Sequence, residues 1–161
     1  MNSPKTIYVG TDHAGYEMKE QFKKHLTEKS IKFVDLGCFS MDAVDYPDIA
    51  REVCEKVNED QNSYGVLFCG SGIGMSITAN KMQGIRAALC NSEEMAKLSR
   101  QHNKANVLCI GSRLTPLDLA LKMFDIFYVT EFEPVERYVR RVEKVMALDK
   151  GMKGAKIQDR C

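Results

Sequence analysis

Short runs of β-branched and aromatic residues alternate along this chain with longer segments in which apolar residues recur at helical spacing. The runs that predict strands are Thr6–Val9, Ile31–Leu36, Val66–Cys69, Arg86–Leu89 and Val107–Ile110. The segments that predict helices span residues 15–29, 47–59, 73–82, 92–102, 116–128 and 134–148. Repeated strand–helix alternation favours a parallel sheet with helices on both faces. We therefore predict an α/β three-layer sandwich around a central five-stranded parallel sheet.

Residues able to do chemistry follow three of the predicted strands. Ligands of open parallel sheets bind beyond the carboxyl ends of the strands. The residues found at those ends are Asp12 and His13 after the first strand, Cys69–Gly72 after the third, and Gly111–Arg113 after the fifth. Their position alone predicts a ligand site at this edge of the sheet.

The segment Cys69–Gly74 is the most informative of these ends. It follows an apolar strand and opens a predicted helix, and its alternating glycines let the backbone approach a ligand closely. Free N–H groups at a helix start stabilise an anion or a developing enolate. We expect them also to depress the pKa of the Cys69 thiol, which could then act as a base or nucleophile. A tight turn with an inert, buried cysteine is the competing interpretation, because glycine-rich turns are common.

Two histidines and an aspartate add groups that transfer protons or bind hydroxyls. Asp12 and His13 could bind a phosphorylated sugar, although an Asp helix cap beside a surface histidine is the simpler explanation. His102 ends the fourth predicted helix and could move a proton to or from a ring oxygen, or simply complement the helix C-terminus. His25 lies among lysines, and we expect it on the solvated surface.

Arg137 and Arg141 lie four residues apart, so they share one face of the last predicted helix. A pair of planar guanidinium groups suits a phosphate. The alternative is a solvated face with ion pairs to Glu136 and Glu143, the usual fate of such charges.

Composition excludes several classes of protein. A net charge of +1 argues against nucleic-acid binding, and no apolar run is long enough to span a membrane. None of the six cysteines has C-x-x-C spacing, so we expect a reduced, cytoplasmic chain. No metal-ligand cluster and no P-loop lysine is present. The pattern therefore favours cofactor-free and metal-free proton transfer on a small phosphorylated substrate.

Together these segments resemble the type B ribose-5-phosphate isomerases, the family that also contains the galactose-6-phosphate isomerase subunits. The matching segments run in family order over about residues 5–148: Val9–Gly15, Asp45–Pro47, Cys69–Ile77, Ala79–Lys81, His102–Asn103, Gly111–Arg113 and Glu136–Arg141. The resemblance implies a single Rossmann-like domain over residues 1–150. The glycines and lysines of residues 151–161 predict a flexible tail. The resemblance also implies a homodimer, or a tetramer of two dimers, with the active site at the subunit interface.

By the same resemblance, the chain interconverts ribose 5-phosphate and ribulose 5-phosphate through an enediolate, in the pentose phosphate pathway. Cys69 would be the base, His102 would help to open the sugar ring, and Ser71 with the following amides would stabilise the enediolate. Asp12 would contact the sugar hydroxyls. The phosphate would be held by His13, Arg113, Arg137 and Arg141. The rest of the pocket would comprise Asp45, Tyr46, Gly70, Gly72, Ile73, Gly74 and Asn103.

Two positions depart from common family patterns. Ser71 stands where many members with the cysteine base have threonine, a change that keeps the hydroxyl. Met75 stands where a second subgroup has a catalytic glutamate, so only the cysteine route is left.

Two other functions compete with this one. One is isomerisation of allose 6-phosphate or galactose 6-phosphate, and the combination of Cys69 with His102 in one chain favours the pentose. The other is a phosphate-binding regulatory module on a flavodoxin-like fold, which the fold alone would permit. A thiol and an imidazole at the site argue against that module, because a passive binder needs neither.

Overall fold

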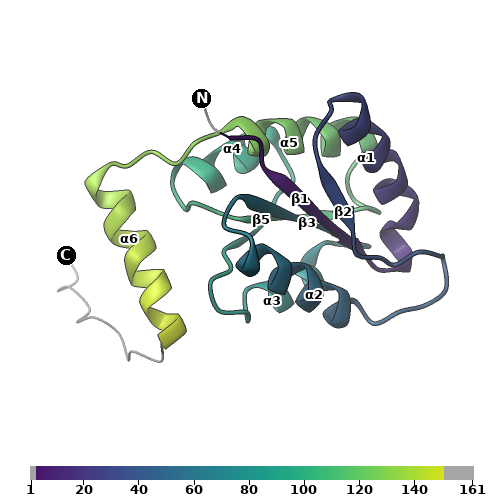
Figure 1. Cartoon of the computed structure of the whole chain (residues 1–161), viewed down its shortest axis with the longest axis horizontal. Coiled ribbons are helices and arrows are strands. Elements are labelled where there is room, and N and C mark those ends of the chain that lie inside the picture. The colour runs from purple at the N-terminus through teal and green to yellow at the C-terminus, as the bar shows by residue number, and fades with distance from the viewer. Residues whose placement is uncertain (1–2, 151–161) are drawn as a thin grey trace.

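The computed structural model describes residues 3–150, and the predicted tail over 151–161 lies outside this range. Five parallel strands form one sheet in the order β2-β1-β3-β5-β4 (Figure 1). Their bounds are β1 Thr6–Thr11, β2 Phe33–Asp35, β3 Ser63–Cys69, β4 Ala87–Leu89 and β5 Val107–Gly111. The prediction of a central five-stranded parallel sheet is thus confirmed.

Helices cover both faces of this sheet. The helices α1, α4 and α5 pack on one face, and α2 and α3 pack on the other. Their bounds, with that of the last helix, are α1 Tyr16–Glu28, α2 Tyr46–Glu59, α3 Ile73–Ala79, α4 Glu93–Gln101, α5 Leu117–Val129 and α6 Glu136–Ala147. The three predicted layers are present. None of the helices in the described range combines the length and apolar character that a bilayer span requires.

The central strand β3 shows why both faces must be covered. All seven of its residues are buried. Because side chains alternate along a strand, Val66 and Phe68 enter the core beneath α1 and α5, whereas Leu67 and Cys69 enter the core beneath α2 and α3. The continuous apolar run that predicted this strand is therefore the sequence of a strand buried on both faces.

Most predicted helix ends differ from the observed ones by one to three residues. The helix α5 begins at Leu117, with Pro116 rather than Thr115 as its N-cap, and α6 begins at Glu136, two residues after Pro134. The helix α3 ends at Ala79 rather than at residue 82. There the Asn80 side chain accepts a hydrogen bond from the Ala87 N–H (2.8 Å) and donates one to the Ala87 carbonyl (2.9 Å), which joins the chain to the edge strand β4.

The last helix, α6, does not pack on the sheet but stands apart as an arm (Figure 1). Tyr138 is its only buried residue. The end of the arm is held to the turn before β4, where the Gly84 N–H donates to the Asp149 carboxylate (2.7 Å) and Arg86 Nη1 lies 2.8 Å from Met146 Sδ. The sequence predicted the helix but not its separation from the domain.

Candidate active site

The loops after β1, β3 and β5 are joined to one another at the carboxyl edge of the sheet. The Ser112 N–H donates to the Cys69 carbonyl (2.8 Å), and the Arg113 N–H donates to the Gly70 carbonyl (3.0 Å). The Ser112 hydroxyl lies 2.9 Å from the Ala14 carbonyl, so it also reaches the loop after β1. Sequence analysis gave Ser112 no role; its place between two candidate residues at a strand end was the available signal.

The Cys69 thiol lies inside the glycine-rich turn that the sequence singled out. Its side chain is 4% exposed, and its Sγ accepts a hydrogen bond from the Gly72 N–H (3.1 Å). The Ser71 hydroxyl accepts from the Ile73 N–H (3.2 Å). Gly72 adopts a left-handed φ of 75°, which allows the turn to fold back on the thiol. A backbone amide directed at sulfur stabilises the thiolate, which is the reactive form of cysteine.

Three other core thiols, Cys54, Cys90 and Cys109, have raised pKa values. Burial raises the pKa of Cys54 to about 12 and outweighs a hydrogen bond from Ser99 to raise the pKa of Cys90 to about 11. Burial also raises the pKa of Cys109 well above its ordinary value. These three thiols stay protonated at neutral pH, as expected for structural cysteines.

Asp12 and His13 stand beside this turn at the end of β1. The Asp12 carboxylate accepts a hydrogen bond from the Ala14 N–H (2.9 Å) and is 7% exposed, so the capping role is real and the residue also lies at the site. Nδ1 of His13 accepts from the Val44 N–H at 3.4 Å. The capping interpretation of Asp12 is confirmed, and its contact with a sugar stays a prediction.

Tyr46 and Arg113 close the carboxyl edge around the turn. A Cβ added to Gly74 would lie 2.7 Å from the Tyr46 ring, so this ring packs directly on the first turn of α3. A Cβ added to Gly70 would lie 3.3 Å from Arg113 Nη1. Asp45 precedes Tyr46 as the exposed N-cap residue of α2. The predicted residues of this edge are thus brought together, with Ile73 exposed next to them.

His102 and Asn103 are not part of this cluster. They follow α4, whose chain direction is opposite to that of the strands, and so they lie near the amino end of β5. The paired residues Gly65–Val107 and Cys69–Gly111 mark the two ends of the strands concerned. Four residues of strand separate these pairs, which corresponds to about 13 Å. His102 therefore belongs to the opposite edge of the sheet from Cys69.

The arginines of α6 lie on the same side as His102. The Tyr138 ring stacks on the His102 ring with centroids 4.2 Å apart, and Arg137 Nη2 donates to the Tyr138 hydroxyl (2.9 Å). Arg137 and Arg141 are exposed, and within residues 3–150 neither forms an ion pair. Glu136 instead pairs with Arg140, so the alternative in which Glu136 pairs with Arg137 or Arg141 is not observed in the described range. The candidate residues of one chain thus fall into two separate groups, one around Cys69 and one around His102.

Two further expectations can be compared with the geometry. His25 is not a solvated surface residue, because its Nε2 lies 2.8 Å from Asp125 Oδ1 on α5. Within the described part of the chain, no three His, Cys, Asp or Glu side chains are grouped in a way that could hold a metal ion.

Comparison with known proteins gives consistent results. A family described as Ribose/Galactose Isomerase matches residues 7–145. Ribose-5-phosphate isomerase B of Escherichia coli (strain K12) is 40% identical over 145 residues, which cover 90% of this chain and 97% of the relative. The solved structure of ribose-5-phosphate isomerase B of Clostridium thermocellum has a TM-score of 0.88 at 40% identity, covering 91% of this chain and 98% of that one.

The type B ribose 5-phosphate isomerase of Leishmania infantum is equally similar in structure, with a TM-score of 0.88 at 39% identity, covering 92% of this chain and 99% of that one. The resemblance inferred from the sequence motifs is confirmed, and so is the prediction of an isomerase. The chain therefore belongs to the Ribose/Galactose Isomerase family.

Proposed function

We propose that this chain interconverts D-ribose 5-phosphate and D-ribulose 5-phosphate as a cytoplasmic homodimer, within the non-oxidative pentose phosphate pathway. The observation that carries the proposal is the Cys69 thiol, which receives the Gly72 N–H at 3.1 Å in a turn joined to the Asp12 and His13 loop. Relatives named ribose-5-phosphate isomerase B support the substrate.

In this mechanism Cys69 acts as the base on the open-chain aldose. The thiolate removes the proton from C2, the C–H electrons form the C1–C2 double bond, and the charge moves to O1. The proton on O2 then passes to O1 and the Cys69 thiol protonates C1, which gives the ketose. Ser71 and the amides of the turn stabilise the enediolate oxygen, as donors directed at developing charge do.

His102 assists the opening of the sugar ring by donating a proton to the ring oxygen as the C1–O4 bond breaks, while the C1 hydroxyl loses its proton to water and becomes the aldehyde. His13, Arg137 and Arg141 hold the phosphate, with Arg113 close to it, and Asp12 binds hydroxyls. Binding energy from the phosphate, remote from the reacting carbons, orients the substrate. Tyr46, Asp45 and Asn103 complete the pocket walls.

The separation of the two groups of candidate residues supports the homodimer, because each group supplies one half-site of the proposed active site. Cys69 cannot meet His102 and Arg137 of its own chain, because they lie at opposite edges of the sheet. A second copy in a twofold arrangement would bring the Cys69 turn of each chain to the His102 side of the other. Such an isologous interface creates two identical composite sites.

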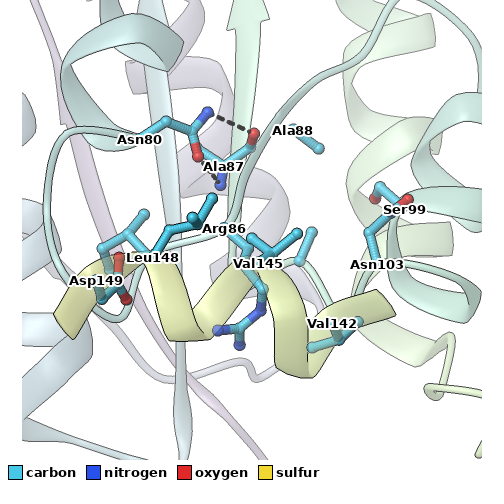
Figure 2. A pocket seen from close by; sticks show the side chains of 12 residues that line it. Asn80, Arg86, Ala87, Ala88, Ser99, Asn103, Val142, Val145, Leu148 and Asp149 are labelled. Atoms are coloured by element: carbon cyan, nitrogen blue, oxygen red, sulfur yellow. Dashed lines mark hydrogen bonds between the residues drawn. The ribbon is translucent and has the colours of Figure 1, made fainter. Parts of the chain in front are cut away.

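The surfaces beside each half-site support this arrangement. A cavity of about 420 Å³ lies between α6 and the β4 edge, and its apolar lining includes Val142, Val145 and Leu148 (Figure 2). Asn103 also lines this cavity. On α3, directly after the Cys69 turn, Ile73 and Ile77 are 50% and 57% exposed. Seating this α3 face beneath the α6 arm of the partner would bury both apolar surfaces.

The first test is turnover of ribose 5-phosphate without added cofactor and with EDTA, measured beside allose 6-phosphate and galactose 6-phosphate. We expect the pentose to have the highest kcat/KM. Cys69→Ala should fold normally and lower kcat by roughly 10²–10⁴-fold, the usual contribution of general acid–base catalysis. Cys90→Ala, which deletes the same atoms from the core on the opposite face, is the matched control. Near-normal turnover by Cys69→Ala would remove Cys69 as the base.

Mixing two inactive variants tests the composite site. Cys69→Ala and the double variant Arg137→Ala/Arg141→Ala are unfolded together at equal concentration and refolded. If each site uses two chains, half of the dimers are mixed and each has one intact site, so activity returns to about a quarter of the wild type. If each chain held a complete site, the mixture would stay inactive and the composite-site proposal would fail.

A further inference from the structure

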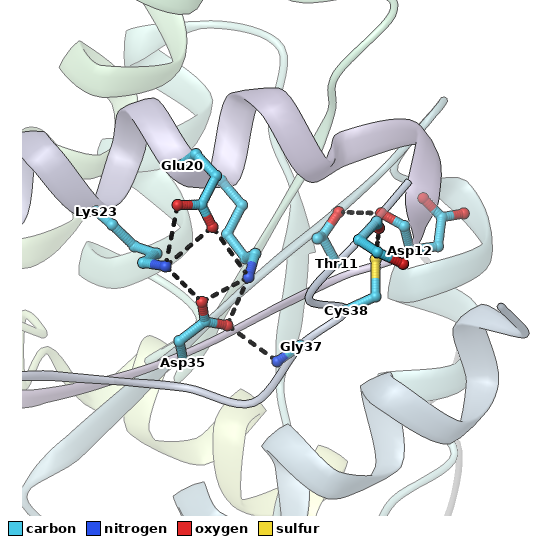
Figure 3. Close-up of polar contacts among 9 residues, drawn as sticks. Thr11, Asp12, Glu20, Lys23, Asp35, Gly37 and Cys38 are labelled. Atoms are coloured by element: carbon cyan, nitrogen blue, oxygen red, sulfur yellow. Dashed lines mark hydrogen bonds and ion pairs between the residues drawn. The ribbon is translucent and has the colours of Figure 1, made fainter. Parts of the chain in front are cut away.

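A lysine side chain is enclosed in the domain beside the site. Lys19 of α1 is 0% exposed. Because lysine is rarely buried without a partner, a group that pairs with its ammonium is expected nearby. Nζ of Lys19 lies 2.7 Å and 2.6 Å from the two carboxylate oxygens of Asp35, the last residue of β2. Figure 3 labels Asp35 together with Lys23 and Gly37, which also contact it. The Phe39 ring covers the ammonium group, with its centroid 5.2 Å away. A buried ion pair is seldom the cheapest way to stabilise a fold, so its retention calls for a specific role.

Asp35 transmits this contact to the backbone that follows β2. Its Oδ1 accepts a hydrogen bond from the Gly37 N–H (2.9 Å), and Lys23 pairs with its other oxygen at 2.7 Å. Burial acts to raise the pKa of Asp35, but the hydrogen bonds from Lys19, Lys23 and Gly37 hold it below its usual value. The carboxylate is therefore charged at neutral pH and fixes the start of the segment 36–44.

This segment is attached to the residues of the site at both ends. Near its start, the Gly37 carbonyl accepts from the Thr11 N–H and the Cys38 N–H donates to the Thr11 carbonyl, both at 2.7 Å. Thr11 immediately precedes Asp12. At the other end, the Val44 N–H donates to Nδ1 of His13. A ring nitrogen that accepts a hydrogen bond carries no proton, so this contact selects the tautomer of His13 with its proton on Nε2.

We propose that Lys19 and Asp35 are positioning residues, whose ion pair holds segment 36–44 against β1 so that Val44 keeps His13 ready to donate from Nε2 to the substrate phosphate. The inference rests on the proposed function, in which His13 is a phosphate ligand. Lys19 itself never touches the substrate. It acts through Asp35, Gly37 and the loop, and the element that carries it, α1, begins directly after the His13 turn.

The test compares Lys19→Met with Lys23→Met. Both remove a cation from Asp35, but the Lys23 side chain is 26% exposed and lies at the rim of the cluster, whereas Lys19 is enclosed. We expect Lys19→Met to raise KM for ribose 5-phosphate by about tenfold with kcat changed by less than about threefold, the signature of lost binding geometry. Lys23→Met should leave both constants near the wild-type values.

A spectroscopic readout separates positioning from general stability. Long-range ¹⁵N–¹H correlations report the tautomer of His13, measured with and without inorganic phosphate. Lys19→Met should convert a single Nε2–H tautomer into a mixture and weaken phosphate binding. Should that variant fold poorly, Lys19→Met/Asp35→Asn removes both buried charges and should give the same changes. A His13 tautomer and KM equal to those of Lys23→Met would overturn the proposal.

Different results would refute the proposed isomerase function and the positioning role of Lys19. If the wild type turns over no sugar phosphate, the proposed function fails, while the tautomer and the phosphate titration still decide the positioning role. If the wild type is active and Lys19→Met keeps the wild-type KM and tautomer, the positioning role alone is wrong.

Discussion

The turn at Gly72 requires a residue without a Cβ atom. Gly72→Ala forces a left-handed φ of 75° on an alanine, which costs about 1–2 kcal/mol. The new Cβ would lie 2.8 Å from the Gly111 nitrogen and 2.9 Å from the Ile110 carbonyl carbon. Both are backbone atoms of β5, an interior strand that cannot move alone, so overpacking adds about 1–3 kcal/mol. We expect a total loss of about 2–5 kcal/mol.

Gly70→Ala, two residues earlier in the same turn, is the matched control. Its Cβ would meet Arg113 Nη1 at 3.3 Å and Ala14 Cβ at 3.7 Å, and Gly70 does not have a left-handed φ. The nearest atom is the end of a flexible side chain, which can shift. We expect a stability change of less than about 1 kcal/mol. Stability is the readout for this control, because Gly70 also borders the proposed substrate site.

The assay is urea unfolding followed by far-ultraviolet circular dichroism in reducing buffer at one fixed protein concentration, since association contributes to stability. For a domain of this size the slope is about 1–3 kcal/mol per molar urea, so Gly72→Ala should lower the midpoint by about 1–2 M. Midpoints of the two variants within about 0.3 M of each other would refute the reasoning. The backbone of β5 would then have to accommodate a side chain at Gly72.

Two further predictions concern other parts of the chain. Arg100→Met should destabilise the fold by about 2–5 kcal/mol in the same urea assay. The substitution removes the hydrogen-bond donor to the Ala105 carbonyl, the Thr130 carbonyl (3.2 Å) and the Tyr64 hydroxyl (2.6 Å). As a control, Arg51→Met at an exposed position should cost less than about 0.5 kcal/mol. Ile77→Asp should convert the proposed dimer to a folded monomer in size-exclusion chromatography. Val129→Asp on α5, where Val129 is 70% exposed against 57% for Ile77, should remain dimeric.

The sheet was predictable because its strands are buried on both faces. Val66–Cys69 and Val107–Ile110 are continuous apolar runs, and glycine or polar residues flank each of them. The bounds of a strand were harder to predict where hydrogen bonds to neighbouring segments determine them. The run Ile31–Leu36 contains a strand of three residues, Phe33–Asp35, because the Ile31 N–H closes α1 on the Leu26 carbonyl.

The residues at the carboxyl edge were also predictable, because parallel strands bring their ends together. Lys19 was missed, although the sequence held a signal for it. Lys19, Phe22 and Leu26 follow the i, i+3, i+7 spacing of one helix face, and all three are buried. A lysine on the apolar stripe of a helix predicts a buried partner. The identity of that partner, Asp35, could not be read from spacing, because it depends on which strand lies beside β1.

The division of the site follows from the topology of any parallel sheet. A crossover helix runs opposite to the strands, so the residue that ends it arrives at the amino edge. His102 ends α4, and Cys69 ends β3, so no adjustment of loops can bring the two together within one domain. Proton transfer needs its groups within hydrogen-bond reach of a single small substrate. The proposed mechanism uses both residues in one reaction, so it requires one of them to come from a second copy; under that proposal, association serves the chemistry and not only stability.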